Sequence, residues 1–288
     1  SLDITQSDNV KVMGYGILSG EYKSGAEVMA ETQNSAIWDE FVKYFMIRGN
    51  PQGENIELHG ICIINSPCYN SQDINEFQNV KVISPWMYCS DGFHARPTAT
   101  RKGVVNRCFA FCGDDIFYMN YSWKGDLEIT DCFGASTNNN VFLIGYWGWD
   151  MSHNYQGIAK NIYVKPMMQK DTIGNAVFRA VIDGATSETG FKNQHYENIY
   201  VEGNLLVPLI SISNTLYPWP EQQHYNKLGN LYDCTFKNIT VSGRQYSYSL
   251  LWGLDENNGI SNVVFENLTF QGVKVTEENK SDYFEINE

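Results

Sequence analysis

NIELHGICIIN from Asn55 and NVKVIS from Asn79 are two copies of a short motif that recurs along the chain. Other copies read DLEITDCFGA from Asp126, ENIYVEGN from Glu197 and SNVVFENLTFQGVKV from Ser261. Within each copy apolar and polar residues alternate, which is typical of a strand with one buried face. Helical periodicity is nearly absent, so the chain is predicted to be all-β.

The spacing of the copies indicates how the strands are arranged. Asn55 to Asn79 is 24 residues, Asn79 to Gly103 is again 24, and later spacings are longer. One strong strand in each short period is the pattern of a solenoid. Leucine-rich repeats would need regular Leu positions, and propeller blades would need about 40–45 residues. A right-handed parallel β-helix fits best, with Cys108 and Cys132 stacked in one interior column.

The domain organisation is predicted as one parallel β-helix over residues 1–288. Residues 21–54 form an insertion, in which Ser35–Ile47 (SAIWDEFVKYFMI) is compatible with a short helix. A β-helix must cover its ends, since a bare strand edge is a site of aggregation. Either Ser1–Ser7 folds over the first coil or an upstream domain has been removed, and we favour the second.

Composition narrows the range of partners. The net charge is −13, which argues against nucleic acid and anionic membranes because both need basic patches. No apolar run of membrane-spanning length and no signal peptide are seen in the sequence. Seven cysteines without CxxC spacing are interpreted as buried thiols, with one disulfide involving Cys68 or Cys89 as an alternative. We expect no metal, no cofactor and a monomer.

Three aspartates recur at the coil spacing. Asp91 lies in SDGFH, and Asp114 and Asp115 lie in CGDDIFY, 23 and 24 residues later. Equivalent positions on successive coils lie about 4.8 Å apart along the axis, so the three carboxylates are expected to cluster. A single Asp after a strand is more often a turn former, and a Ca²⁺ site is the main chemical alternative.

Clustered carboxylates suit one particular chemistry. Like charges raise the pKa of at least one carboxyl group, which then stays protonated while a neighbour is ionised. Glycoside hydrolysis needs this pair, an acid for the leaving oxygen and a base for water. In inverting enzymes the two groups lie about 6.5–9.5 Å apart. The sequence therefore predicts a polysaccharide hydrolase with Asp91, Asp114 and Asp115 as catalytic residues.

The pattern SDGFH, then CGDDIFYMNYS, then NNNVFLIGYWG resembles glycoside hydrolase family 49, the dextranases. It is more distantly similar to the polygalacturonases of family 28. The resemblance implies that Asp114 is the general acid and that Asp91 and Asp115 hold and deprotonate water. The Gly-His-Gly turn and the Arg-Ile-Lys motif of polygalacturonases are missing from the sequence, so a pectin substrate is not inferred.

The substrate prediction is an inverting hydrolase of an α-glucan such as dextran, secreted, periplasmic or at the cell surface. The alternatives are another glycan, including a uronate-containing or sulfated one, or a non-catalytic glycan-binding β-helix. Aromatic platforms stack on sugar rings, and polar groups orient them. The residues predicted to bind substrate are His94, Tyr118, Tyr121, Trp123, Tyr146, Trp147 and Arg179.

Overall fold

The computed structural model describes most of the chain. The described residues are 2–20, 46–66, 68–85, 90–119, 125–145, 155–168, 175–181, 191–213, 231–253 and 259–287. Within them the regular structure is almost entirely β-strand, with one 3-10 turn, Lys280–Asp282. None of the helices in these ranges has the length and apolar character needed to cross a bilayer.

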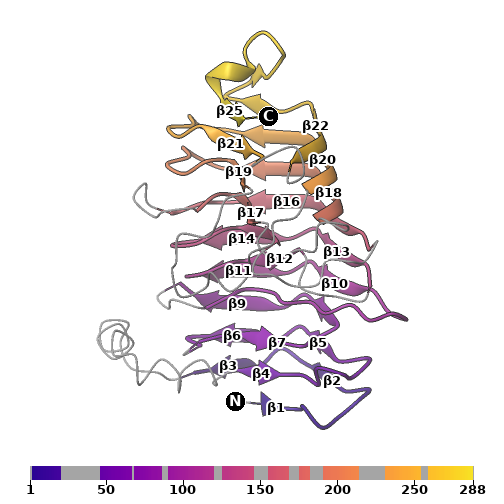
Figure 1. Cartoon of the computed structure of the whole chain (residues 1–288). Coiled ribbons are helices and arrows are strands. Elements are labelled where there is room, and N and C mark those ends of the chain that lie inside the picture. Colours follow the sequence, from indigo (N-terminus) through magenta and orange to yellow (C-terminus); the bar gives the residue numbers. More distant parts are fainter. Residues whose placement is uncertain are drawn as a thin grey trace, which may run out of the picture.

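The largest sheet has two arms that form two faces of a coil (Figure 1). The first arm contains β2 (Lys11–Met13), β5 (Glu57–His59), β8 (Glu76–Gln78), β10 (Gly103–Asn106) and β13 (Leu127–Thr130). The second contains β3 (Ile17–Ser19), β6 (Cys62–Ile64), β9 (Lys81–Ser84), β11 (Phe109–Cys112) and β14 (Phe133–Ser136). Both arms join at β16 (Gly157–Val164) and continue as β18 (Phe191–Val201) and β20 (Leu231–Val241), followed by β22 (Ile260–Glu266) and β23 (Thr269–Phe270).

The third face is built from two shorter sheets. One contains β1 (Leu2–Asp3), β4 (Ile47–Arg48) and β7 (Ser71–Gln72). The other contains β12 (Phe117–Tyr118), β15 (Phe142–Gly145), β17 (Phe178–Val181), β19 (Ile210–Ser213), β21 (Ser249–Trp252) and β25 (Phe284–Asn287). Between them only the isolated bridges Ile74↔Ala95 and Phe93↔Phe117 continue the face in the described residues. The sheet is therefore interrupted beside the three aspartates.

The register confirms the predicted parallel β-helix. Glu57 pairs in parallel with Glu76, Glu76 with Val104, and Val104 with Glu128, so each pair is one coil apart. The same column continues to Ile158 and His195. The predicted right-handed sense is the one that nearly all parallel crossover connections adopt. Pairing of β23 with β24 (Val273–Lys274) is antiparallel and belongs to the last coil.

The predicted equivalence of Asn55, Asn79 and Gly103 is wrong. Asn55 precedes β5, Asn79 follows β8, and Gly103 is the first residue of β10. Asn55 and Asn79 both have positive φ, at 62° and 52°. Asn tolerates this left-handed conformation better than most residues, so it marks more than one turn in a coil. A spacing between two Asn residues therefore need not equal one coil.

A true ladder of asparagines lies at the bend between the two arms. Asn161, Asn198, Asn238 and Asn267 all have φ between 55° and 57°. Each side-chain amide donates to the side-chain oxygen of the residue one coil earlier, at 3.0 Å, 2.9 Å and 3.0 Å for the last three. The ladder satisfies side-chain groups that the repeated bend brings together.

The core fills the inside of the coil with stacked columns. Phe93, Phe117, Phe142 and Phe178 are fully buried, and the stacked centroids of Phe142 and Phe178 lie 4.8 Å apart. Cys108 and Cys132 are also buried at equivalent positions, and the Cys108 N–H donates to Cys132 Sγ at 3.4 Å. The predicted cysteine column is confirmed. Cys68 is a buried free thiol, and Cys89 lies outside the described residues.

The structure bears on two of the alternatives and boundaries predicted for the first coil. Leu2 and Asp3 form β1 and pair with Ile47 and Arg48, so the start of the chain contributes a strand to the third face instead of folding over the end. Ile47–Arg48 is thus part of the β-helix, although the predicted insertion extended to residue 54. The predicted helix lies outside the described residues apart from its last two positions, and Ile47 begins a strand.

Candidate active site

The three aspartates lie at the turn from the second arm to the third face. The backbone N–H of Gly92 donates to the carbonyl of Asp115 at 2.8 Å, and Phe93 bridges to Phe117. Asp91 and Asp115 therefore occupy equivalent positions on consecutive coils. Each of the three carboxylates places an oxygen within 4.8 Å of the other two. The structure brings together the three side chains that the coil spacing grouped.

The cluster is buried, which changes its protonation. Asp91, Asp114 and Asp115 are only 2%, 6% and 5% exposed. Burial raises the pKa of Asp91 well above its ordinary value, and the charges of Asp114 and Asp115 add to the effect. Burial and the charge of Asp114 likewise raise the pKa of Asp115. The cluster therefore retains protons at a pH where isolated aspartates are ionised.

The separation of the carboxyl groups bears on the predicted stereochemistry. One oxygen of each carboxylate lies within 4.8 Å of the others, whereas the roughly 6.5–9.5 Å typical of inverting enzymes is measured between whole carboxyl groups. The distance thus gives no independent support for inversion, which stays a prediction that rests on the sequence resemblance. The close approach favours proton sharing among the three groups.

Two asparagines that the sequence reasoning left unassigned hold the aspartates in place. The backbone N–H and Nδ2 of Asn140 donate to Asp115 Oδ1 at 3.0 Å and 2.8 Å. Asn139 Nδ2 donates to Asp114 Oδ1. Both asparagines follow their partners by 25 residues, about one coil. The spacing that identified the aspartates would have identified these amides if it had been extended to polar residues.

His94 contacts the cluster from the side of Asp91. Its Nε2 lies 3.1 Å from Asp91 Oδ2, and its side chain is 9% exposed. Burial lowers the pKa of His94 to about 3. With this lowered pKa His94 is a neutral imidazole at neutral pH, so its contact with Asp91 is not an ion pair, although the geometry alone would suit one.

Tyr118 covers the other side of the cluster. Its hydroxyl group donates to Asp115 Oδ2 at 3.4 Å, and its ring lies 3.7 Å from the imidazole of His94, measured between centroids. Burial, followed by the charges of the aspartates, raises the pKa of Tyr118 well above its ordinary value. Tyr118 is therefore a neutral hydrogen-bond donor at the site. The prediction that it and His94 bind substrate is consistent with their place beside the carboxylates.

Arg179 lies in the same column of the third face as Tyr118. Tyr118 pairs with Leu143, and Leu143 pairs with Arg179, so the two residues are two coils apart. Burial lowers the pKa of Arg179 to about 10, and the charge of Asp115 acts in the opposite direction. Its Nη1 donates to Ser211 Oγ on the next coil. A charged guanidinium thus lies within electrostatic reach of the cluster.

A buried network of polar side chains holds the turn that carries Asp91. Asn70 Nδ2 donates to the carbonyl of Asp91 at 2.7 Å, and Asn70 Oδ1 accepts from Ser84 Oγ at 3.0 Å. Ser90 Oγ donates to the carbonyl of Ser84 at 2.6 Å and accepts from the N–H of Gly113 at 2.8 Å. Since buried polar groups cost free energy when unpaired, the network favours one conformation of the backbone that carries Asp91.

The remaining predicted substrate-binding residues cannot be placed at the site. Tyr121, Trp123, Tyr146 and Trp147 lie outside the described residues. Their assignment stays a prediction from the sequence.

Replacing Asp91 by Asn is expected to stabilise the fold at neutral pH by about 0.5–2 kcal/mol, as removal of strained functional groups often does. The folded-state pKa of Asp91 is raised, so the wild-type protein is most stable with Asp91 protonated, below pH 3.8. The wild type loses this stability as the pH rises from 3.8 towards the folded pKa, and the advantage of the Asn variant grows over the same range. Urea unfolding of both proteins at several pH values measures the difference. A gain that persists undiminished below the ordinary pKa would contradict this explanation.

Comparison with known proteins places this site in context. No family model matches the chain. A dextranase from Arthrobacter globiformis is 25% identical over 239 residues, which cover 73% of this chain and 35% of that protein. A dextranase from Arthrobacter sp. strain CB-8 gives the same figures. The chain is similar to dextranases. It spans about a third of the length of these curated relatives.

Two solved structures have the same fold. Dex49A from Penicillium minioluteum superimposes with a TM-score of 0.62 and 18% identity, over 96% of this chain and 48% of that one. Endo-xylogalacturonan hydrolase from Aspergillus tubingensis gives 0.55 and 14%, over 99% of this chain and 74% of that one. The resemblance inferred from the aspartate motifs is thereby confirmed. At these identities the structural likeness shows the fold alone.

Proposed function

We propose that this chain carries the catalytic site of a glycoside hydrolase that cleaves a polysaccharide outside the cell or at its surface. The observation that carries the proposal is the buried cluster of Asp91, Asp114 and Asp115, in which one oxygen of each carboxylate lies within 4.8 Å of the others. An acid and a base in one cluster are what glycosidic hydrolysis requires. The similarity to dextranases makes an α-glucan such as dextran the first substrate to test.

The proposed division of roles gives the proton to Asp114. In this scheme Asp114 donates its proton to the leaving oxygen, while Asp91 and Asp115 orient a water molecule and remove its proton. The acid role of Asp114 comes from the sequence resemblance. Hydrolysis needs at least one protonated carboxyl group in the cluster. The raised pKa values of Asp91 and Asp115 support this requirement, because ionising all three buried groups together costs free energy.

The surrounding donors favour this chemistry over a Ca²⁺ site. Ca²⁺ takes six to eight oxygen ligands. Here the amides of Asn139 and Asn140 direct N–H groups at the oxygens of Asp114 and Asp115. Donors in these positions stabilise carboxylates directly and compete with a cation for the same oxygens.

A reducing-sugar assay on dextran, pullulan, mutan, carrageenan and pectin tests the proposal. We expect turnover of dextran, and NMR of the first product should show the β-anomer if hydrolysis of the α-linkage inverts the configuration. Turnover of another glycan would keep the catalytic proposal and replace the substrate. Binding without turnover of any of them would favour a non-catalytic glycan-binding protein.

Replacing Asn140 by Ala is expected to move the acidic limb of the activity profile to higher pH. Asn140 donates to Asp115 and lowers its pKa, so loss of the side-chain donor raises the pKa of this proposed base. The shift should be about one to two pH units, since a hydrogen bond to a charged group contributes about 1.5–3 kcal/mol. The pH dependence of kcat/KM measures it, with Asn161→Ala in the outer ladder as control. An unchanged limb would remove Asp115 from the role of base.

A further inference from the structure

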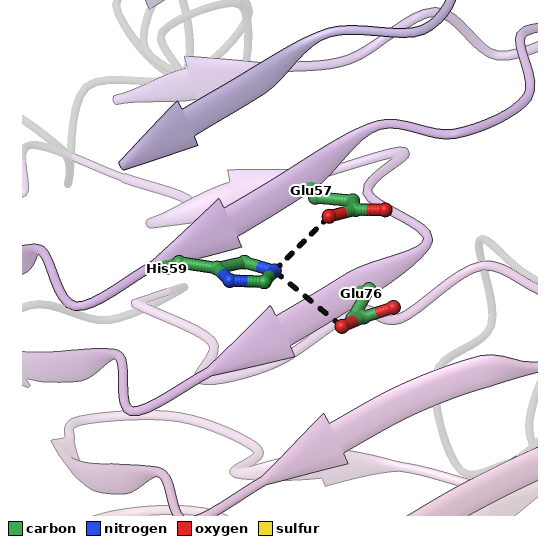
Figure 2. A group of neighbouring side chains, drawn as sticks. All are labelled: Glu57, His59 and Glu76. Carbon is green, nitrogen blue, oxygen red and sulfur yellow. Dashed lines mark ion pairs between the residues drawn. The ribbon is translucent and has the colours of Figure 1, made fainter. Parts of the chain in front are cut away.

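A second group of side chains lies on the outer surface of the first arm, away from the aspartates. Glu57 and His59 project from β5, and Glu76 projects from β8 one coil later (Figure 2). Glu57 and Glu76 are direct register partners, so two negative charges stand side by side. Like charges at paired positions are destabilising unless something between them compensates. We propose that these three residues bind a divalent transition-metal ion of the zinc type.

The imidazole of His59 converges with the two carboxylates. His59 Nε2 lies 3.2 Å from Glu57 Oε2 and 3.4 Å from Glu76 Oε1, as Figure 2 shows. Ligand atoms bound tetrahedrally to zinc at about 2.0–2.1 Å are separated from one another by about 3.3–3.4 Å. The two nitrogen–oxygen distances therefore already match two edges of such a site.

The nitrogen at the centre of this group lacks a well-formed hydrogen bond. Within the described part of the chain, His59 Nε2 is a buried atom that makes no hydrogen bond, although both oxygens are near. A buried polar nitrogen that makes no hydrogen bond costs free energy even where carboxylate oxygens lie near it. A metal ion held between the nitrogen and the two oxygens would satisfy all three atoms together.

Arg101 holds the two carboxylates in this arrangement. Its Nη2 lies 2.7 Å from Glu57 Oε1 and 2.7 Å from Glu76 Oε2, which are the oxygens that face away from His59. Its Nη1 donates to Asn55 Oδ1 at 2.6 Å. Hydrogen bonds to the outer atoms of ligands are the usual support of metal sites. Arg101 leaves one oxygen of each carboxylate directed at His59.

Lys11 would compete with a metal ion for one oxygen of Glu57. Its Nζ lies 3.1 Å from Glu57 Oε2, the oxygen that faces His59, and its side chain is 44% exposed. Burial raises the pKa of Glu57, but the hydrogen bonds from Arg101 and Lys11 outweigh it and leave this pKa below its ordinary value. An exposed lysine side chain can swing into solvent, so an arriving cation would replace one positive charge with another at the same oxygen.

Titration of the protein with Zn²⁺ by calorimetry tests the inference, which does not depend on the hydrolytic function. The wild type should bind Zn²⁺ in the micromolar range, and His59→Ala should weaken binding by about 10–100-fold or more. His195→Ala is the matched control, because His195 lies on the same sheet with Thr235 Oγ1 as its partner and should leave binding unchanged. Circular dichroism verifies the fold of each variant.

Lys11→Met gives the second arm of the test, because it predicts a gain that misfolding could not produce. Removal of the competing ammonium group should tighten Zn²⁺ binding, and Zn²⁺ should then raise the melting temperature further, since a ligand of the folded state stabilises it. Absence of Zn²⁺ binding in the wild type, or equal binding in His59→Ala, would overturn the proposal. Weaker or unchanged binding in Lys11→Met would do the same.

Discussion

Replacing Asp114 by Asn is expected to reduce kcat/KM on the cleaved glycan by about 10²–10⁴-fold, the contribution of a general acid. Asn has the same shape as Asp, and its oxygen can still accept from Asn139 and from the N–H of Asp115. The loss should therefore appear in catalysis while the fold is kept. Asn is uncharged, so the substitution adds no buried charge to the cluster and gives no reason for lower stability.

Asp131→Asn is the matched control for this variant. Asp131 is exposed and accepts from Asn161 in the outer ladder, where other coils use Asn in the same role. Its activity should stay close to that of the wild type. Reducing-sugar release measured under identical conditions compares the two. Full turnover in Asp114→Asn would exclude the proposed acid, whereas loss in both variants would indicate a general effect on the protein.

Replacing Phe142 by Ala is expected to lower the free energy of unfolding by about 3–5 kcal/mol, the cost of a large cavity in a core. Phe142 is fully buried between Phe117 and Phe178, at centroid distances of 5.2 Å and 4.8 Å. Its ring also contacts the ring of Tyr196 in a T-shaped arrangement. The cavity would lie two residues from Asn140, so a loss of activity should accompany the loss of stability.

Phe133→Ala separates this effect from the loss of an aromatic ring in general. Phe133 belongs to a neighbouring strand and stacks on Phe109 at 4.7 Å, but it lies on the outside of the coil and is half-buried. Water can fill the space that its ring leaves, so the cost should be clearly smaller. Urea unfolding measures both variants. A greater loss in Phe133→Ala would show that the outer aromatic column, and not the core, supports these coils.

Much of the fold could be predicted from the sequence because strand alternation is a local property. The alternation in Ile56 and Leu58, or in Val80 and Val82, identifies a buried face without knowledge of any partner. The stacking of Cys108 on Cys132 could also be predicted, because the 24 residues between them equal one coil. The register of Asn55 was misassigned because a left-handed turn residue is a signal of conformation and not of position in the coil.

The candidate site, like the fold, could be predicted from the sequence only in part. Asp91 and Asp115 could be paired in advance because turns of similar length preserve the coil spacing between them. The amides of Asn139 and Asn140 follow the same spacing, but an amide has no charge pattern that makes it conspicuous in a sequence. Arg179 was predicted to bind substrate, whereas its place two coils from Tyr118 depends on the register that pairs both residues with Leu143.

By itself the sequence determined the repeated coil and the meeting of three aspartates, since both follow from residue type and spacing along the chain. Only the tertiary structure decided how those aspartates are protonated, because burial and mutual charge depend on everything packed around them. It also decided that His59 faces two glutamates from successive coils. Such convergence depends on register, and register is a property of the assembled sheet.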